Sequence, residues 1–286
     1  MDWALIVTAI VVIVAIGFDF TNGFHDAANA IATSVGTRAL APATALALAA
    51  VFNFIGAFIG YWTGSGVAKT IQSVTTPPSG YAGLALVAAA LGGAIGWNLV
   101  TWRLGLPSSS THALIGGVVG AALVAGTIVE WGTVWEKVII PVVTSPFVGL
   151  ILAFLVMRLI VVIFRNKNPQ KVGGGFRHAQ SVSACAMAMG HGMQDAQKTM
   201  GVIFLLLISM GYASASDEMP VWIVFACAGA ISIGTAVGGK RIMKTLGRRI
   251  IDLDPARGFS AESVSATVLY VTALGLDAPV STTQVI

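Results

Sequence analysis

The residues most able to do chemistry are acids that lie inside apolar sequence. Asp26 follows His25 in the stretch 22–29, Asn-Gly-Phe-His-Asp-Ala-Ala-Asn, and Asp19 precedes it by seven residues (26 − 19 = 7). A charge at bilayer depth costs roughly 2.5–3.5 kcal/mol on insertion scales, so such an acid needs a partner or a function. Because Gly23 weakens helix continuity, we expect a broken transmembrane helix at an ion or substrate site. Asp19 either belongs to this site or caps the break.

The same pattern recurs later in the chain. The stretch 191–198, His-Gly-Met-Gln-Asp-Ala-Gln-Lys, places Asp195 169 residues after Asp26 (195 − 26 = 169). Pro-Ser-Ser-Ser-Thr-His at 107–112 and Pro-Val-Ser-Thr-Thr-Gln at 279–284 are 172 residues apart (279 − 107 = 172). A weaker third pair consists of two Lys-Thr dipeptides. Motifs in the same order at a near-constant offset predict an internal duplication.

The two Ser/Thr motifs are typical of helix starts. Proline ends the preceding helix, and a Ser or Thr hydroxyl caps the next one. Free backbone N–H groups and hydroxyls at a helix start bind anions without an Arg or Lys. We expect the two starts to face each other at the membrane midplane and hold one tetrahedral oxyanion between them. The alternative is that these hydroxyls only bond local carbonyls; His112 and Gln284, which follow the motifs, are expected to support the helices.

The acids would repel an anion unless a cation lies beside them. Asp26 and Asp195 with amide or carbonyl oxygens suit Na⁺, whereas a protonated Asp near His25 suits H⁺ coupling. In either case the cation and the oxyanion offset each other's desolvation, which is the physical basis of symport. The alternative for Asp195 is a structural ion pair with Lys198, three residues further on. Glu262, alone in an apolar segment, is either a further cation ligand or a residue near the membrane edge.

Composition places the chain in a membrane. Hydrophobic residues make up 56%, charged residues 10%, and the mean hydropathy is +0.85. Soluble domains have about 25% charged residues, so we expect an all-α polytopic membrane protein. Residues 3–20 lack the basic start of a cleaved signal peptide. The net charge of +4 comes from basic residues clustered in two loops, which indicates topology and not nucleic-acid binding.

The apolar segments fall into two halves. We expect a first repeat at 1–165, a basic linker at 166–178 and a second repeat at 179–286. The basic loops 165–178 and 240–257 are separated by two spans, so both are expected to be cytoplasmic, with the N-terminus outside. Repeats with an odd number of crossings are inverted, as in secondary transporters, and re-entrant helical hairpins keep the same parity. The second repeat lacks the apolar sequence that follows the first Ser/Thr motif, so we expect a chain truncated at its C-terminus.

With these motifs the chain resembles the inorganic phosphate transporter (PiT) family, which carries duplicated G-x-N-D-x-x-N/K and P-x-S-T-T-H type motifs. The resemblance implies cation-coupled phosphate import by a homodimer in the plasma membrane, with a transport domain moving against a scaffold. The implied phosphate site is Ser109, Ser110, Thr111, Ser281, Thr282 and Thr283. The expected cation site is Asp26, His25, Asn29, Asp195, Gln194 and Glu262, with Asp26 and Asp195 as Na⁺ ligands if the coupling ion is sodium.

Departures from the family pattern leave alternatives open. His25 and Gln194 replace the family's Asn before Asp, and Gln284 replaces its final His. His25 makes H⁺ coupling an alternative to Na⁺, and the motifs do not separate phosphate from sulfate or a metal-phosphate. A channel would repeat a polar ring by oligomer symmetry. An intramembrane acid hydrolase would need two acids converging on a water path. We expect no enzyme activity and no cofactor beyond the co-transported cation.

Overall fold

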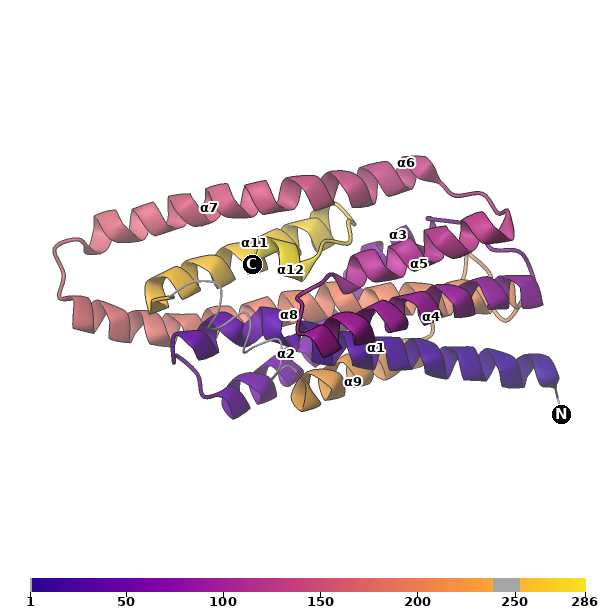
Figure 1. Ribbon diagram of the computed structural model, residues 1–286, viewed down its shortest axis with the longest axis horizontal. Helices are drawn as coiled ribbons and strands as arrows, with labels where there is room; N and C mark the ends of the chain where they lie inside the picture. Colours follow the sequence, from indigo (N-terminus) through magenta and orange to yellow (C-terminus); the bar gives the residue numbers. More distant parts are fainter. Residues whose placement is uncertain (1, 239–252) are drawn as a thin grey trace.

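The computed structural model describes residues 2–238 and 253–286, with the backbone alone at 27–29. The described chain is helical and contains no strand, only an isolated antiparallel bridge between Thr75 and Val129. The helices in chain order are α1 Trp3–Gly36, α2 Pro42–Trp62, α3 Gly66–Gln72, α4 Tyr81–Leu104, α5 Ser110–Ala125, α6 Trp131–Thr133, the π-helical turn η1 Val134–Ile139, α7 Ile140–Phe164, α8 Pro169–Ser209, α9 Val221–Val237, α11 Pro255–Gly275 and α12 Thr282–Val285 (Figure 1).

Several of these helices are built to cross a membrane. In the described chain, four helical runs are long and apolar enough: Trp3–Gly36, Pro42–Trp62, Tyr81–Leu104 and Trp131–Phe164. The last run, α6 to α7, exposes large apolar side chains on most of its surface, which is typical of a helix that faces lipid. The expected class, an all-α polytopic membrane protein, is confirmed.

Helix α8 lies at the centre of the molecule. All its residues from Gly190 to Leu206 are buried, and α2, α11, α1 and α3 pack against it. This buried stretch contains the whole second Asp motif. A helix buried on every side is usually apolar, so its polar side chains must find partners on the neighbouring helices.

The expected helix break at the Asp motifs is wrong. Helix α1 runs without interruption through 22–29, and α8 runs through 191–198. A Cβ on Gly23 would lie 2.3 Å from the Ile231 carbonyl oxygen of α9, and one on Gly192 would lie 2.1 Å from the Asn53 carbonyl oxygen of α2. The glycines therefore permit two close helix crossings, and packing at these crossings offsets their low helix propensity.

The connection between the halves, predicted as a basic linker at 166–178, is largely helical. Helix α8 already begins at Pro169, with the Asn168 side chain accepting a hydrogen bond from the Gln170 amide at 2.9 Å. Phe176 stacks edge-on against Phe164 of α7. This cap and this contact offset the cost of three successive glycines, so most of the segment 166–178 is helical. Of the second basic loop, the part at 240–252 lies outside the described residues.

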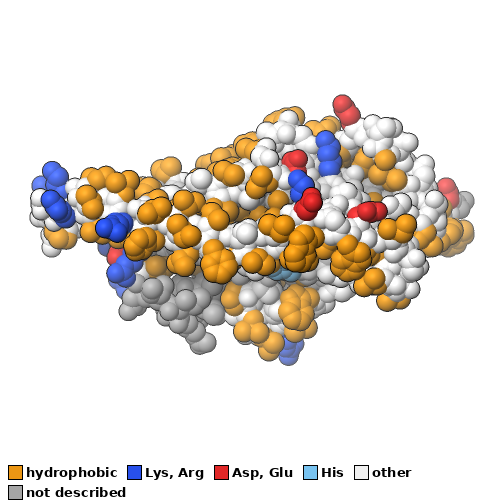
Figure 2. Space-filling view, turned by 90° about the horizontal axis from the view of Figure 1, so that it is seen from above, with side chains coloured by type: hydrophobic (Ala, Val, Ile, Leu, Met, Phe, Trp, Pro, Cys, Tyr) orange, Lys and Arg blue, Asp and Glu red, His pale blue; other side chains and the backbone are white. Residues whose placement is uncertain are grey.

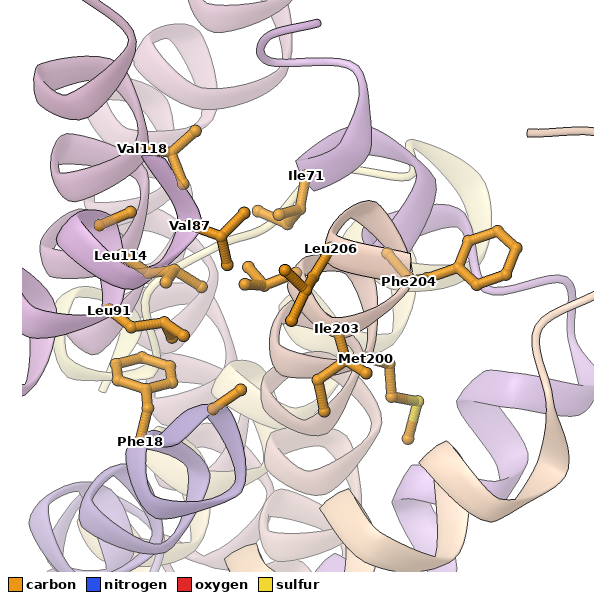
Figure 3. Close-up of a cluster of buried hydrophobic side chains, with 14 of the residues drawn as sticks. Phe18, Ile71, Val87, Leu91, Leu114, Val118, Met200, Ile203, Phe204 and Leu206 are labelled. Carbon is orange, nitrogen blue, oxygen red and sulfur yellow. The ribbon is translucent and has the colours of Figure 1, made fainter. Parts of the chain in front are cut away.

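Two helical hairpins enter the molecule from opposite ends. In Figure 1 α4 and α5 lie in the half that contains the N-terminus, whereas α11 and α12 come from the other end, and the tips meet near the middle. Apolar side chains of α1, α4, α5 and α8 fill the space between the first hairpin and the central helix, among them Phe18, Leu91, Leu114 and Ile203 (Figure 3). The core thus fixes the first hairpin against both Asp-bearing helices.

Charge is unevenly distributed between the ends, although some Lys and Arg side chains also lie among the acidic ones. On the face shown in Figure 2, Lys and Arg gather at the end where α7 connects to α8, and most acidic side chains lie in the opposite half. Hydrophobic side chains cover the surface between them. This distribution is typical of a protein with polar ends and a lipid-facing middle.

Candidate ion-binding site

Both Ser/Thr motifs begin a helix, as predicted. Ser109 is the N-cap of α5, and its Oγ accepts a hydrogen bond from the His112 amide at 3.2 Å. Ser281 occupies the corresponding position before α12, without a side-chain cap bond. Its buried Oγ has no hydrogen-bond partner among the described residues. One serine hydroxyl is thus used for capping, and the other is left for a further partner.

The two motifs contact each other reciprocally. The Thr111 hydroxyl donates to the Val280 carbonyl oxygen at 3.5 Å, and the Thr283 hydroxyl donates to the Ser108 carbonyl oxygen at 3.1 Å. The residues correspond at one offset (283 − 111 = 172 and 280 − 108 = 172). Each motif therefore uses the same residue to bond the same position of the other, which is the pattern expected of a local two-fold relation.

Asp26 lies directly beside the first motif. Its Oδ2 accepts a hydrogen bond from the Ser110 hydroxyl at 2.7 Å, and its Oδ1 lies 2.7 Å from His25 Nδ1. The other ring nitrogen of His25 lies 3.0 Å from the Thr101 hydroxyl on α4. Helix α1 thus joins its carboxylate to the tip of the first hairpin through a serine and a histidine, and all four side chains are buried.

Asp195 has a different set of partners. Lys198 Nζ lies 2.5 Å from its Oδ1, while Asn22 Nδ2 donates to its Oδ2 at 3.1 Å. His191 Nε2 lies 3.3 Å from the same oxygen. Lys198 also donates to the Thr111 hydroxyl of the first motif. The ion pair between Asp195 and Lys198, expected as an alternative, is present. The first Ser/Thr motif was predicted to bind an anion without Lys or Arg, yet Lys198 contacts it.

One group of side chains has the spacing of a metal or cation site. The nearest ligand atoms of Asp26, His191 and Asp195 all lie within 4.8 Å of one another, and all three residues are buried. Two carboxylate oxygens and an imidazole nitrogen can coordinate a cation. His191 is a candidate site residue that the sequence reasoning missed, although it opens the second Asp motif.

Gln194 holds the second hairpin in place. Among the described residues, it forms no hydrogen bond with Asp26 or Asp195. Its Nε2 donates to the Thr272 hydroxyl at 2.7 Å and to the Leu269 carbonyl oxygen at 3.1 Å, both on α11. Its Oε1 accepts from the Val280 amide at 2.9 Å. All hydrogen-bonding groups of the Gln194 amide are engaged in positioning the second motif. None of these bonds supports the expected role of Gln194 as a cation ligand.

Glu262 forms a separate cluster. Its Oε1 accepts from Thr33 and Ser34, each at 2.5 Å, and its Oε2 accepts from Ser183 at 2.6 Å. Ser34 lies eight residues beyond Asp26, which is about 12 Å along a helix. Glu262 is therefore fully hydrogen-bonded at another level of the molecule. The expectation that it joins the cation site of Asp26 and Asp195 is wrong. The Asn29 side chain lies outside the described residues.

The comparisons with known proteins agree on one family. The model of the phosphate transporter family matches residues 22–286. The chain is 43% identical over its whole length to a probable low-affinity inorganic phosphate transporter of Bacillus subtilis, of which 85% is covered. It is 46% identical over 276 residues to one of Rhizobium meliloti, with 96% of this chain and 80% of the relative covered.

A solved structure gives the same result. The protein described as "The sodium-dependent phosphate transporter" superposes with a TM-score of 0.86 at 25% identity, covering 98% of this chain and 87% of that one. The family consists of transporters, so the predicted absence of enzyme activity is confirmed. The chain therefore belongs to the phosphate transporter family, as its duplicated motifs predicted.

Proposed function

We propose that this chain imports inorganic phosphate through the plasma membrane by symport with Na⁺ or H⁺, and that it holds the oxyanion between its two Ser/Thr motifs. One observation carries the proposal. The motifs are in reciprocal contact, and the first of them bonds both to Asp26, through Ser110, and to the Asp195–Lys198 pair, through Thr111. Anion and cation sites thus share atoms.

Phosphate is bound by hydroxyls, helix-start amides and one ammonium group. The ligands are Ser109, Ser110, Thr111, Ser281, Thr282 and Thr283, with the first turn of α5 directed at the anion. Lys198 exchanges its bond to Thr111 for a phosphate oxygen, because a charge-assisted bond to an oxyanion is stronger than one to a neutral hydroxyl. Asp195 keeps the ammonium in place while this exchange occurs.

The coupling cation neutralises the charge that remains. Two anionic side chains close to a phosphate would repel it, and Lys198 compensates only one of them. A cation beside Asp26, His191 and Asp195 compensates the other, so phosphate and cation bind together. The relative described as sodium-dependent supports Na⁺. The short contact between His25 and Asp26 supports H⁺ as the alternative.

Alternating access uses the two hairpins. Residues 1–165 and 179–286 are inverted repeats, and α4/α5 and α11/α12 form the moving gate on either side of the bound ions. Support comes from their entry at opposite ends of the molecule and from the reciprocal motif contacts. The charge separation supports a cytoplasmic basic end and an external N-terminus. The lipid-facing α7 is available for a homodimer contact.

Uptake of ³²P-phosphate into proteoliposomes tests this function. We expect Asp26→Asn and Asp195→Asn to abolish uptake, because each removes charge that holds the cation. Asp217→Asn, in the exposed turn before α9, is the matched control and should transport normally. Wild-type-like uptake in both motif variants contradicts the coupling proposal. Imposed Na⁺ and pH gradients identify the driving ion, and equimolar sulfate or a divalent metal shows whether the substrate is phosphate alone.

A further inference from the structure

Asp19 is a buried acid that accepts no hydrogen bond of normal geometry in the described chain. Its side chain is fully buried in the middle of α1, and neither carboxylate oxygen has a hydrogen-bond partner among the described residues. Asp195 and Glu262, which are equally buried, each accept several hydrogen bonds. An unpaired carboxylate in a low-dielectric interior is so unfavourable that it requires an explanation, and a bound ion is one.

Two further oxygens beside Asp19 share this property. The Oδ1 of Asn22 and the Oγ1 of Thr199 are buried and have no hydrogen-bond partner in the described chain. Asn22 lies three residues after Asp19 and therefore on the same face of α1. Thr199 neighbours the Asp19 carboxyl from α8, and the Cys227 thiol neighbours it from α9. Four buried oxygen atoms, two of them from one carboxylate, thus make no hydrogen bond of normal geometry in this region between α1 and α8, where the Thr199 hydroxyl and the Cys227 thiol face the Asp19 carboxyl.

The surroundings determine which ligand these oxygens suit. Among the described residues, Asp195 and Lys198 are charged groups within electrostatic reach of Asp19, and they already form a pair with each other. Phe18 and Met200, the chain neighbours of Asp19 and Thr199, belong to the apolar core (Figure 3). An oxygen-only set with a single net negative charge in an apolar wall favours a hard monovalent cation, since a divalent ion would leave an uncompensated buried charge.

We propose that Asp19, Asn22 and Thr199 bind one sodium ion between α1 and α8. This proposal rests on the proposed function, because the sodium ion at this site is one of the co-transported ions. It is distinct from the group of Asp26, His191 and Asp195. It exists in one half only, because the duplicated position of Asp19 is Ala188 (19 + 169 = 188). The duplication therefore gives two aspartates at the phosphate but a single acid at this site.

A chain of contacts links this sodium site to the phosphate motif. Asn22 uses its oxygen for the ion and its Nδ2 for Asp195, which holds Lys198, which in turn bonds Thr111. A sodium ion on the Asn22 oxygen fixes the amide in the orientation that serves Asp195. Occupancy of the sodium site thereby stabilises the arrangement that presents Lys198 to the first Ser/Thr motif.

Binding of ²²Na⁺ to the purified full chain in lipid nanodiscs, without phosphate, tests the site. We expect Asp19→Asn to weaken binding by at least about tenfold and Thr199→Val to weaken it by a smaller factor. Thr21→Val is the matched control on α1, since the Thr21 hydroxyl donates to the Phe18 carbonyl of its own helix at 2.7 Å. That control should bind Na⁺ like the wild type.

Thermal unfolding in choline chloride and in NaCl shows whether the variants are folded. Asp19→Asn removes a buried charge, so we expect it to unfold no earlier than the wild type in choline. NaCl should stabilise the wild type more than the variant, which keeps only the cation site of Asp26, His191 and Asp195. Undiminished ²²Na⁺ binding by Asp19→Asn overturns the proposal. Proton uptake at Asp19 without any Na⁺ binding by the wild type also overturns it.

The same experiments separate this proposal from the proposed function. Loss of ²²Na⁺ binding in Asp19→Asn, in a chain whose wild type takes up no phosphate, supports the sodium site and contradicts symport of phosphate. Na⁺-driven phosphate uptake that is equal in the wild type and Asp19→Asn overturns the sodium site and leaves symport standing.

Discussion

At the residue scale, the central feature is a lysine shared by two functional motifs. Lys198 pairs with Asp195 on its own helix and reaches Thr111 on α5. The first contact was predicted as an alternative from the sequence, because residues three apart on a helix are neighbours. It could not show the second, which joins residues 87 apart and depends on where the first hairpin docks. The ion pair of Lys198 with Asp195 and its contact with the first Ser/Thr motif are therefore parts of one hydrogen-bond network.

Removing Lys198 should expose the cost of burying Asp195. We expect Lys198→Met to lower the free energy of unfolding by about 3–5 kcal/mol, because it leaves an uncompensated carboxylate in the interior. Arg257→Met is the matched control, since Arg257 forms an i,i+3 pair with Asp254 whose side chains are 55% and 51% exposed. Its loss should cost no more than about 1 kcal/mol. Denaturant unfolding in detergent measures both changes.

A double variant checks that the charge is the cause. Asp195→Asn combined with Lys198→Met leaves no charge of this pair, so most of the lost stability should return. Equal losses in Lys198→Met and Arg257→Met, or no recovery in the double variant, would contradict this account.

At the scale of elements, hydropathy located the helices, and tertiary packing decided their continuity. The Pro-Ser and Pro-Val motifs begin helices as predicted, because proline and hydroxyl caps act locally. Gly23 was expected to interrupt a helix, yet it lies inside α1, and the glycines at 173–175 lie inside α8. Helix propensity is a local preference, whereas the close approach of α9 to Gly23 was not visible from local sequence.

Alanine substitutions distinguish a packing glycine from a flexible one. Gly192→Ala would place its Cβ 2.1 Å from the Asn53 carbonyl oxygen, so α2 and α8 must separate, and we expect a loss of about 2 kcal/mol or more. Gly17→Ala meets nothing within 4 Å and should stabilise α1 by about 0.5–1 kcal/mol. Thermal unfolding measures both. A neutral Gly192→Ala would mean that the crossing is loose.

At the scale of the whole molecule, the duplication predicted that distant motifs would meet, and they do. Thr111 and Thr283 make equivalent bonds across the centre. Glu262 was expected as a further cation ligand or near the membrane edge only because it is a lone acid in an apolar segment, and it lies with Ser34 and Ser183. An acid outside the repeated motifs has no counterpart to fix its level along the helices, so its position depended on the packed structure.

The length of α8 leads to a prediction about the membrane. Its 41 residues span about 60 Å, twice the hydrocarbon thickness, so we expect its two ends on opposite sides of the membrane. Lys167 precedes the helix in the basic connection, and Ser216 follows it in the acidic turn; both are exposed. By the excess of Lys and Arg, the Lys167 end is expected in the cytoplasm.

Cysteine labelling in intact cells tests this topology on a chain with Cys185→Ser, which leaves only the buried native Cys227. A membrane-impermeant maleimide should modify Ser216→Cys from outside and should reach Lys167→Cys only after permeabilisation. The reverse result would invert the orientation, and with it the direction from which each hairpin opens. Labelling of both positions from outside would mean that α8 does not cross the bilayer. Its burial would then result from packing against α2 and α11 alone.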